Sequence, residues 1–157
     1  MTDPTFLTPA AHEKLKAELD HLTTVGRDEI AERIAEARSH GDLRENADYD
    51  AAKNDQGLME ARIRQLTSLL QNAEVRVAEA SDTVQVGSVV TVVDSDGDEL
   101  RYFVAPQENR VPGLLLASPT SPVGAALIGA SVGDEVTYDA PGGTFSMTVT
   151  AVEPYEG

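Results

Sequence analysis

Apolar residues recur every three or four positions through the first half of the chain, a spacing typical of one face of an α-helix. Thr8 and Pro9 fit the N-cap and the first position of this helix. The step from Leu22 to Ile30 is eight residues, one more than a heptad, and Gly26 lies inside it. We therefore expect an irregular turn or bend near residues 24–27. The other apolar positions of this stretch are Leu15, Leu19, Ile34 and Ala37.

The second helical stretch is more regular. Its inward positions alternate in steps of three and four, with one polar residue among them: Tyr49, Ala52, Gln56, Met59, Ile63, Leu66, Leu70 and Ala73. That spacing is typical of a coiled-coil seam. Because the two stretches are joined by a short turn, they must be antiparallel neighbours, each about 45 Å long for about 30 residues. Residues 1–77 are therefore predicted to form an antiparallel coiled-coil hairpin, with its tip at residues 41–49.

The pattern changes after a polar linker at residues 78–85. Residues 86–157 alternate short β-branched runs with turns, which is typical of strands. Ser121 and Pro122 fit the start of one short helix. The fold class is therefore α+β, with the helical hairpin followed by a small antiparallel sheet and one helix. The predicted strands are 86–93, 100–104, 136–139 and 144–152, and 114–116 is a further apolar run.

Acidic residues cluster at the predicted tip, where Asp42, Glu45, Asp48 and Asp50 fall within nine residues. One interpretation is helix capping, since acids near a helix N-terminus are favourable by about 0.3–1 kcal/mol each. The other is chemical: Asp42 and Glu45 are three residues apart around a turn and could share one hard cation. Two carboxylates with water form a typical partial site for Mg²⁺. Sequence alone leaves both interpretations open.

Composition narrows the choice of partners. The formal net charge is −15. Residues 1–77 carry 15 acids and 10 bases, giving −5, and residues 78–157 carry 12 acids and 2 bases, giving −10. A general nucleic-acid binder needs a basic surface, so a basic protein or a metal is the better partner. The chain has no cysteine, no apolar signal segment and no membrane-length apolar run, so a cytoplasmic protein is expected.

A second acidic run, residues 94–99, superficially resembles a calcium loop. Its glycine falls at the fourth position, and the twelfth position is Ala105 where an EF-hand needs glutamate. We therefore predict a hairpin turn there.

The tip sequence also resembles a known family. The run Gly41-Asp42-Leu43-Arg44-Glu45-Asn46, with Tyr49, Lys53 and the surrounding residues 37–63, is similar to the signature of the GreA/GreB transcript cleavage factors, and closest to the GreA branch. Residues 118–124, 132–136 and 140–143 resemble the C-terminal domain of the same family. The resemblance extends over nearly the whole chain.

This resemblance implies a coiled coil followed by an FKBP-like domain that docks on bacterial RNA polymerase. The coiled coil would enter the secondary channel and meet the 3′ end of backtracked RNA. There Asp42 and Glu45 would hold a second Mg²⁺, shared with the polymerase, and promote hydrolysis of the transcript by the polymerase itself. The protein would thus be no enzyme on its own. Two-metal hydrolysis stabilises both the attacking and the leaving oxygen, which agrees with a carboxylate pair.

The resemblance also assigns supporting roles. Leu43, Arg44, Asn46 and Tyr49 would support the tip, although Tyr49 also fits the seam as a packing residue. Lys53 would face extruded RNA, or else be a solvated helix charge paired with a nearby acid. The candidates for polymerase docking are Ser121, Pro122 and Gly124.

Two other functions fit the same pattern. The protein could occupy the polymerase channel as an inhibitor without aiding hydrolysis, although the tip acids that such inhibitory relatives alter are present here. It could also be a coiled-coil scaffold or FKBP-like chaperone without a polymerase partner. The polar Gln56 in the seam favours a free monomer over a longer self-assembling coil.

Overall fold

The structure is a computed structural model that describes residues 4–39 and 46–156. Contacts divide the described residues into two compact units: a sheet unit, residues 4–12 with 73–156, and a helical unit, residues 13–39 with 46–72, which we call the helical arm. The first strand of the chain thus belongs with the C-terminal sheet, and Val84, in the segment predicted as a linker, is fully buried in the core of the sheet unit.

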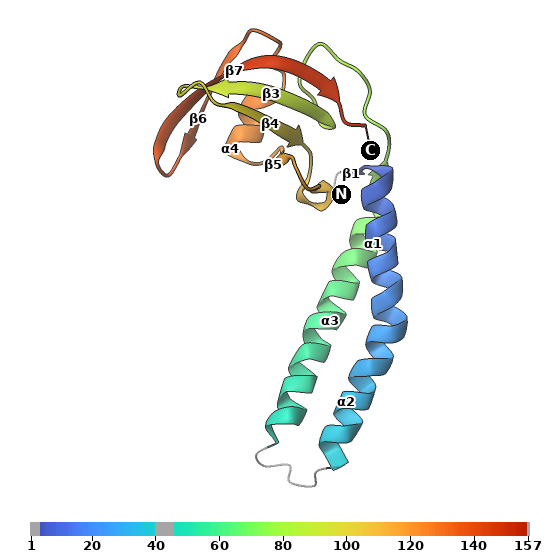
Figure 1. Cartoon of the computed structure of the whole chain (residues 1–157). Coiled ribbons are helices and arrows are strands. Elements are labelled where there is room, and N and C mark those ends of the chain that lie inside the picture. Colours follow the sequence, from blue (N-terminus) through green and yellow to red (C-terminus); the bar gives the residue numbers. More distant parts are fainter. Residues whose placement is uncertain (1–3, 40–45, 157) are drawn as a thin grey trace. The chain divides into compact units, whose positions relative to one another are not determined.

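The helical arm consists of two antiparallel helical segments (Figure 1). Arg27 pairs with Glu60 and Arg33 with Asp55. A later residue of the first segment thus pairs with an earlier residue of the second, as antiparallel segments require. One segment comprises α1 (Pro9–His21), of which residues 13–21 belong to the arm, the π-helical turn η1 (Leu22–Gly26) and α2 (Arg27–Ser39). The other segment is α3 (Ala47–Gln71).

Several local predictions for the helices are confirmed. The hydroxyl of Thr8 accepts a hydrogen bond from the N–H of Ala11 at 3.1 Å, so it caps α1, and Pro9 is the first helical residue. The expected irregularity is η1, which overlaps the predicted residues 24–27 and begins two residues before them. Each predicted inward position of α3 is buried or half-buried.

The sheet unit contains, within the described residues, a five-stranded sheet in the order β5-β4-β3-β7-β6. Its strands are β3 (Ser88–Asp94), β4 (Glu99–Val104), β5 (Leu115–Ala117), β6 (Glu135–Ala140) and β7 (Gly143–Pro154). The pairs β3–β4, β3–β7 and β6–β7 are antiparallel. The prediction of a wholly antiparallel sheet was wrong, because β5 pairs parallel to β4. The connection 105–114, which contains the short helix η2 (Gln107–Asn109), carries the chain back across the sheet instead of forming a tight turn.

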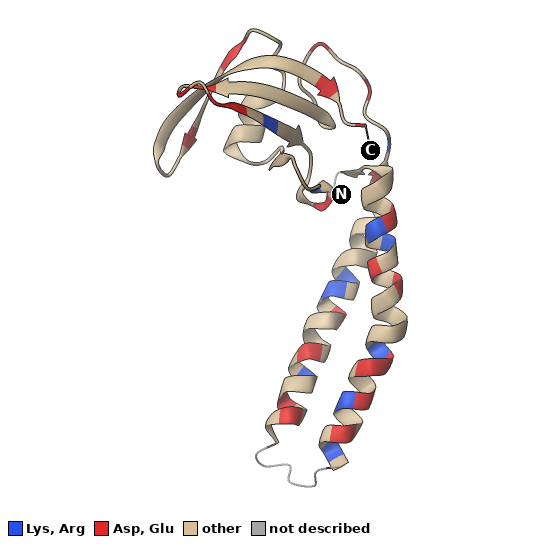
Figure 2. Ribbon diagram, viewed as in Figure 1, with Lys and Arg blue, Asp and Glu red and all other residues tan. Residues whose placement is uncertain are grey.

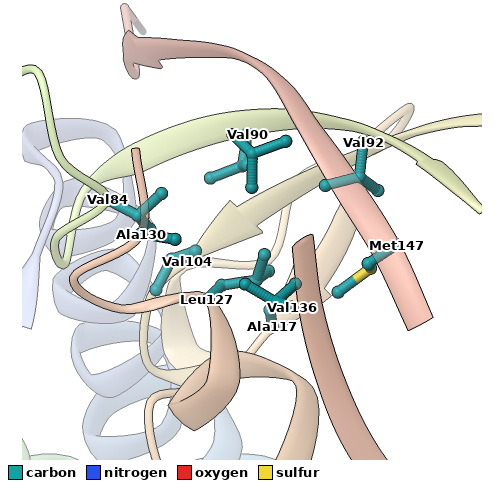
Figure 3. Close-up of a cluster of buried hydrophobic side chains, with 10 residues drawn as sticks. Val84, Val90, Val92, Val104, Ala117, Leu127, Ala130, Val136 and Met147 are labelled. Atoms are coloured by element: carbon teal, nitrogen blue, oxygen red, sulfur yellow. The ribbon is translucent and has the colours of Figure 1, made fainter. Parts of the chain in front are cut away.

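The core of this unit follows the two-residue period of its strands. Val90 and Val92 of β3 join Val104, Met147 and Leu127 in one buried cluster (Figure 3). Leu127 comes from α4 (Pro122–Leu127), which begins at the predicted residue and covers this face of the sheet.

The opposite face carries a second, smaller cluster. Val89 and Phe103 point to this side and pack with Phe6 of β1 (Thr5–Leu7). Strand β1 pairs parallel with β2 (Ala73–Val75), a two-stranded sheet that local sequence patterns did not predict.

In the part of the chain that the structure describes, the helices are all too short or too polar to cross a membrane.

Candidate functional site

Asn46 joins the ends of the two helical segments next to the predicted tip. Its side-chain oxygen accepts a hydrogen bond from the N–H of Tyr49 at 3.0 Å, which makes Asn46 the N-cap of α3. Its side-chain amide donates to the carbonyl of Ala37, near the end of α2. Asn46 therefore bonds backbone groups of both segments, a common use of asparagine at turns.

Tyr49 packs on the arm's inner side. It is half-buried against Ile30, Ile34 and Ala52, so its packing role is confirmed. The guanidinium carbon of Arg38 lies 5.7 Å from the centre of the Tyr49 ring, within cation–π range. This contact ties the last turn of α2 to the first turn of α3.

The predicted metal-binding pair, Asp42 and Glu45, lies outside the described residues, as do Leu43 and Arg44. The start of α3 limits which acids can act as helix caps. Asn46 holds the N-cap position, and the acids within the first turn of α3 are Asp48 and Asp50. The metal-binding role of Asp42 and Glu45 stays a prediction.

Lys53 lies on an exposed part of α3, and its ammonium donates to the side-chain oxygen of Gln56 at 2.9 Å. The alternative to RNA contact was pairing with an acid, and the partner that the structure gives is a neutral amide. The positive charge of Lys53 is therefore not neutralised by this contact, although RNA contact remains a prediction.

Lys, Arg, Asp and Glu residues recur along both segments of the arm (Figure 2). The guanidinium of Arg62 donates to both carboxylate oxygens of Glu18, at 2.8 and 3.0 Å, and this hydrogen bonding lowers the pKa of Glu18. Arg27 binds Glu60 in the same two-pronged way, which lowers the pKa of Glu60. These pairs hold the two segments in register.

Two of the three docking candidates have local structural roles at the start of α4. The hydroxyl of Ser121 accepts from the N–H of Gly124 at 3.1 Å and donates to the carbonyl of Ser118 at 2.6 Å. Gly124 is buried, and a Cβ added there would lie 1.9 Å from the Ser118 carbonyl oxygen. Ser121 and Gly124 therefore shape the helix start.

Pro122 is the exposed member of that group. Two large apolar side chains that follow it are also exposed, Ile128 at 40% and Val132 at 60%. The structure brings Ser121, Pro122 and Gly124 together at one helix start, and their part in docking stays a prediction.

The second acidic run forms the predicted hairpin turn between β3 and β4. One carboxylate oxygen of Asp94 accepts the N–H groups of Asp96 and Asp98, at 3.0 and 2.9 Å. One carboxylate oxygen from each of these three residues lies within 4.8 Å of the other two. The turn geometry alone explains why Asp94 is there.

Asn109 is a buried polar residue that the sequence pattern did not single out. Its side chain binds the N–H of Thr8 and the carbonyls of Phe6 and Pro106. A lone asparagine in an irregular connection has no periodic signal, so only the fold reveals it.

The described fold and site define a protein with an antiparallel helical arm and a small α+β sheet unit. Residues 5–75 match the family model of the N-terminal domain of GreA/GreB transcription elongation factors, and residues 79–154 match the model of their C-terminal domain. The chain therefore belongs to the GreA/GreB transcription elongation factor family.

Two relatives named GreA agree with this assignment. The chain is 44% identical to transcription elongation factor GreA of Streptomyces coelicolor, over 98% of this chain and 95% of that one. It is 46% identical to GreA of Mycobacteroides abscessus, over 98% of this chain and 97% of that one. A solved structure, GreA factor homolog 1 (Gfh1) of Thermus thermophilus, is 29% identical with a TM-score of 0.45, covering 96% of this chain and 99% of that one.

Proposed function

We propose that this protein is a bacterial transcription elongation factor that stimulates RNA polymerase to cleave backtracked RNA. The observation that carries the proposal is the similarity of the whole chain to factors named GreA, at 44–46% identity over at least 95% of each sequence. The protein would act on the polymerase and not as an enzyme by itself.

In this proposal the helical arm works as a coiled coil that enters the secondary channel, and the FKBP-like sheet unit docks at its mouth. The ion pairs between Glu18 and Arg62 and between Arg27 and Glu60 are consistent with an arm held in fixed register. Asn46, bonded to both Ala37 and Tyr49, would anchor the connection that carries the acidic tip.

Asp42 and Glu45 would hold a Mg²⁺ ion shared with carboxylates of the polymerase. The donor set fits this ion, because carboxylate oxygens are the ligands that Mg²⁺ takes in proteins. When bound, the ion would stabilise the charge that develops on phosphoryl oxygens during hydrolysis. This chain's own part is to bring two carboxylates to the 3′ end of the RNA. Lys53, with its exposed charge, would lie along that RNA.

The test is RNA cleavage in stalled polymerase complexes, titrated with Mg²⁺ in the presence and absence of the protein. The wild-type protein should shorten the RNA and lower the Mg²⁺ concentration that cleavage requires. The double variant Asp42→Ala, Glu45→Ala should lose this effect and still bind polymerase. Asp50→Asn, which removes a neighbouring acid in the first turn of α3, is the matched control and should stay active.

Normal cleavage with the double variant would reject the mechanism. Slower nucleotide addition without shortened RNA would instead identify a channel inhibitor. Failure of the wild-type protein to bind polymerase would favour the scaffold or chaperone function. Light scattering of the free protein tests the expected monomer.

A further inference from the structure

The middle of the helical arm lacks fully buried side chains on both segments. Among residues 16–29 of the first segment and residues 53–62 of α3, all of them described, none is buried. The buried residues lie at the two ends of this stretch. Leu15, Ile63 and Leu66 are on one side of it, and Ile30, Ile34 and Ala52 are on the other. Since packing of apolar faces supplies most helix stability in proteins, the arm is weakest in its middle.

The first segment is also irregular at this level. In η1 the N–H of Arg27 bonds to the carbonyl of Leu22, five residues earlier, as in a π-helix. Single π-turns within α-helices are rare and mark places where helices kink. The turn accommodates the one residue by which the step from Leu22 to Ile30 exceeds a heptad.

Two threonines in this turn bond back to the preceding turn. The hydroxyl of Thr23 donates to the carbonyl of Leu19 at 3.0 Å, and that of Thr24 donates to the carbonyl of Asp20 at 2.7 Å. Such bonds give backbone carbonyls an alternative to the helical N–H, and they often accompany bends. The bonds therefore keep carbonyls satisfied where the regular helical pattern is broken.

Glycines lie on both segments at this level. A Cβ added to Gly26 would lie 3.1 Å from the sulfur of Met59 on α3, so glycine lets the segments approach there. Gly57 has no such reason, because a Cβ added there would meet nothing within 4 Å. A glycine inside a helix costs about 1 kcal/mol relative to alanine. Arg27, next to Gly26, pairs with Glu60, three residues after Gly57. The two glycines therefore lie at about the same level along the arm.

We propose that the helical arm contains a hinge at this level, formed by η1 on one segment and Gln56–Met59 on the other. The two better-packed ends of the arm move about it as separate pieces. Its use in cleavage rests on the function proposed above: bending would let the end that carries Ala37 and Asn46 adjust within a narrow channel. The hinge itself does not depend on that function.

Hydrogen exchange of the full-length protein tests the hinge directly. Backbone amides of residues 22–28 and 56–60 should exchange at least about tenfold faster than those of residues 30–37 and 63–70, because local opening needs less free energy where few side chains are buried. Uniform protection along the arm would overturn the proposal, whatever the protein does to polymerase.

Variants that remove the features of the proposed hinge test it as well. Deletion of Thr24 restores a seven-residue step between Leu22 and Ile30, and Gly57→Ala removes the unexplained glycine. The combined variant should slow exchange in both hinge segments and raise the thermal midpoint. Ser68→Ala, at an exposed position of α3 outside the hinge, is the matched control and should leave hinge exchange unchanged. Unchanged hinge exchange in the combined variant would contradict the assignment.

The role in cleavage has its own readout. The combined variant should bind polymerase with unchanged affinity but stimulate cleavage several-fold less at saturation, and Thr24→Ala, which keeps the residue count, should retain most activity. Full stimulation by the combined variant would remove the hinge from the mechanism. A wild-type protein without stimulation would reject the proposed function, while hydrogen exchange would still decide whether the hinge exists.

Discussion

The N–H of Thr8 donates a 2.8 Å hydrogen bond to the side chain of Asn109, which lies 101 residues later in the chain. Both residues are almost completely buried, at 4% and 1% exposure. The Asn109 amide also donates to the carbonyl of Phe6 at 2.8 Å. One side chain thus satisfies two backbone groups of the N-terminal segment, which buried polar groups require.

Replacing Asn109 by alanine should therefore lower the free energy of unfolding by about 2–4 kcal/mol, because the N–H of Thr8 and the carbonyl of Phe6 would remain buried without partners. Urea unfolding of the full chain measures this. Asn54→Ala, on an exposed face of α3, is the matched control and should change stability by no more than about 0.5 kcal/mol. Equal losses in the two variants would show that the Asn109 bonds contribute little.

Sequence predicted what depends on near neighbours in the chain. The heptad steps located α3, the eight-residue step at Leu22 located η1, and Ser121 with Pro122 located the start of α4. Each of these features depends on residues within one or two helical turns. The closeness of Ser121, Pro122 and Gly124 followed from the same local signal.

Sequence missed what depends on distant pairing. The strand pair of Thr5–Leu7 with Ala73–Val75 joins two segments that precede and follow the arm in the sequence. Each segment has only three residues, too few to show a two-residue period. The parallel pairing of β5 with β4 depends on the path of the chain between them. For the site, residue types and the family resemblance named Asp42 and Glu45, but no local pattern could indicate that Arg38 lies over the Tyr49 ring.

The close contact of Gly124 with Ser118 gives a second stability prediction. Gly124→Ala should destabilise the sheet unit by about 3 kcal/mol or more, because its Cβ would lie 1.9 Å from a backbone oxygen and the backbone would have to shift. Gly142→Ala is the control, since its Cβ would meet Phe145 at an ordinary 3.5 Å. Thermal unfolding by circular dichroism compares them. A Gly124 variant as stable as the Gly142 variant would contradict the contact.

Glu18 should make stability depend on pH. Its hydrogen bonds with Arg62 lower its pKa in the folded state, so they stabilise the protein above the ordinary pKa of glutamate, about 4.3. The benefit is lost as pH falls through the lowered folded pKa. Because the Glu18 side chain is 37% exposed, solvent screens the pair, and Glu18→Gln should cost less than about 1 kcal/mol at pH 7.

Urea unfolding of both proteins at pH 7 and near pH 2 checks this expectation. The difference in unfolding free energy should shrink toward zero at the acidic end, and high salt at pH 7 should also reduce it. A difference of the same size at every pH would show that Glu18 acts through packing of its side chain and not through its charge.

The exposed position of Pro122 makes the proposed docking surface testable without unfolding the protein. A glutamate there would stand at the first position of α4, where negative charge is favourable, so Pro122→Glu should fold normally. If polymerase covers Pro122 together with Ile128 and Val132, the new carboxylate would be buried without a partner. Affinity for polymerase should then fall at least about tenfold.

Pro112→Glu makes the same charge change at an exposed proline of the sheet unit outside α4 and should bind as the wild type does. Binding of fluorescently labelled protein to polymerase gives both dissociation constants. Equal values for Pro122→Glu and the wild-type protein would place the docking surface elsewhere on the molecule.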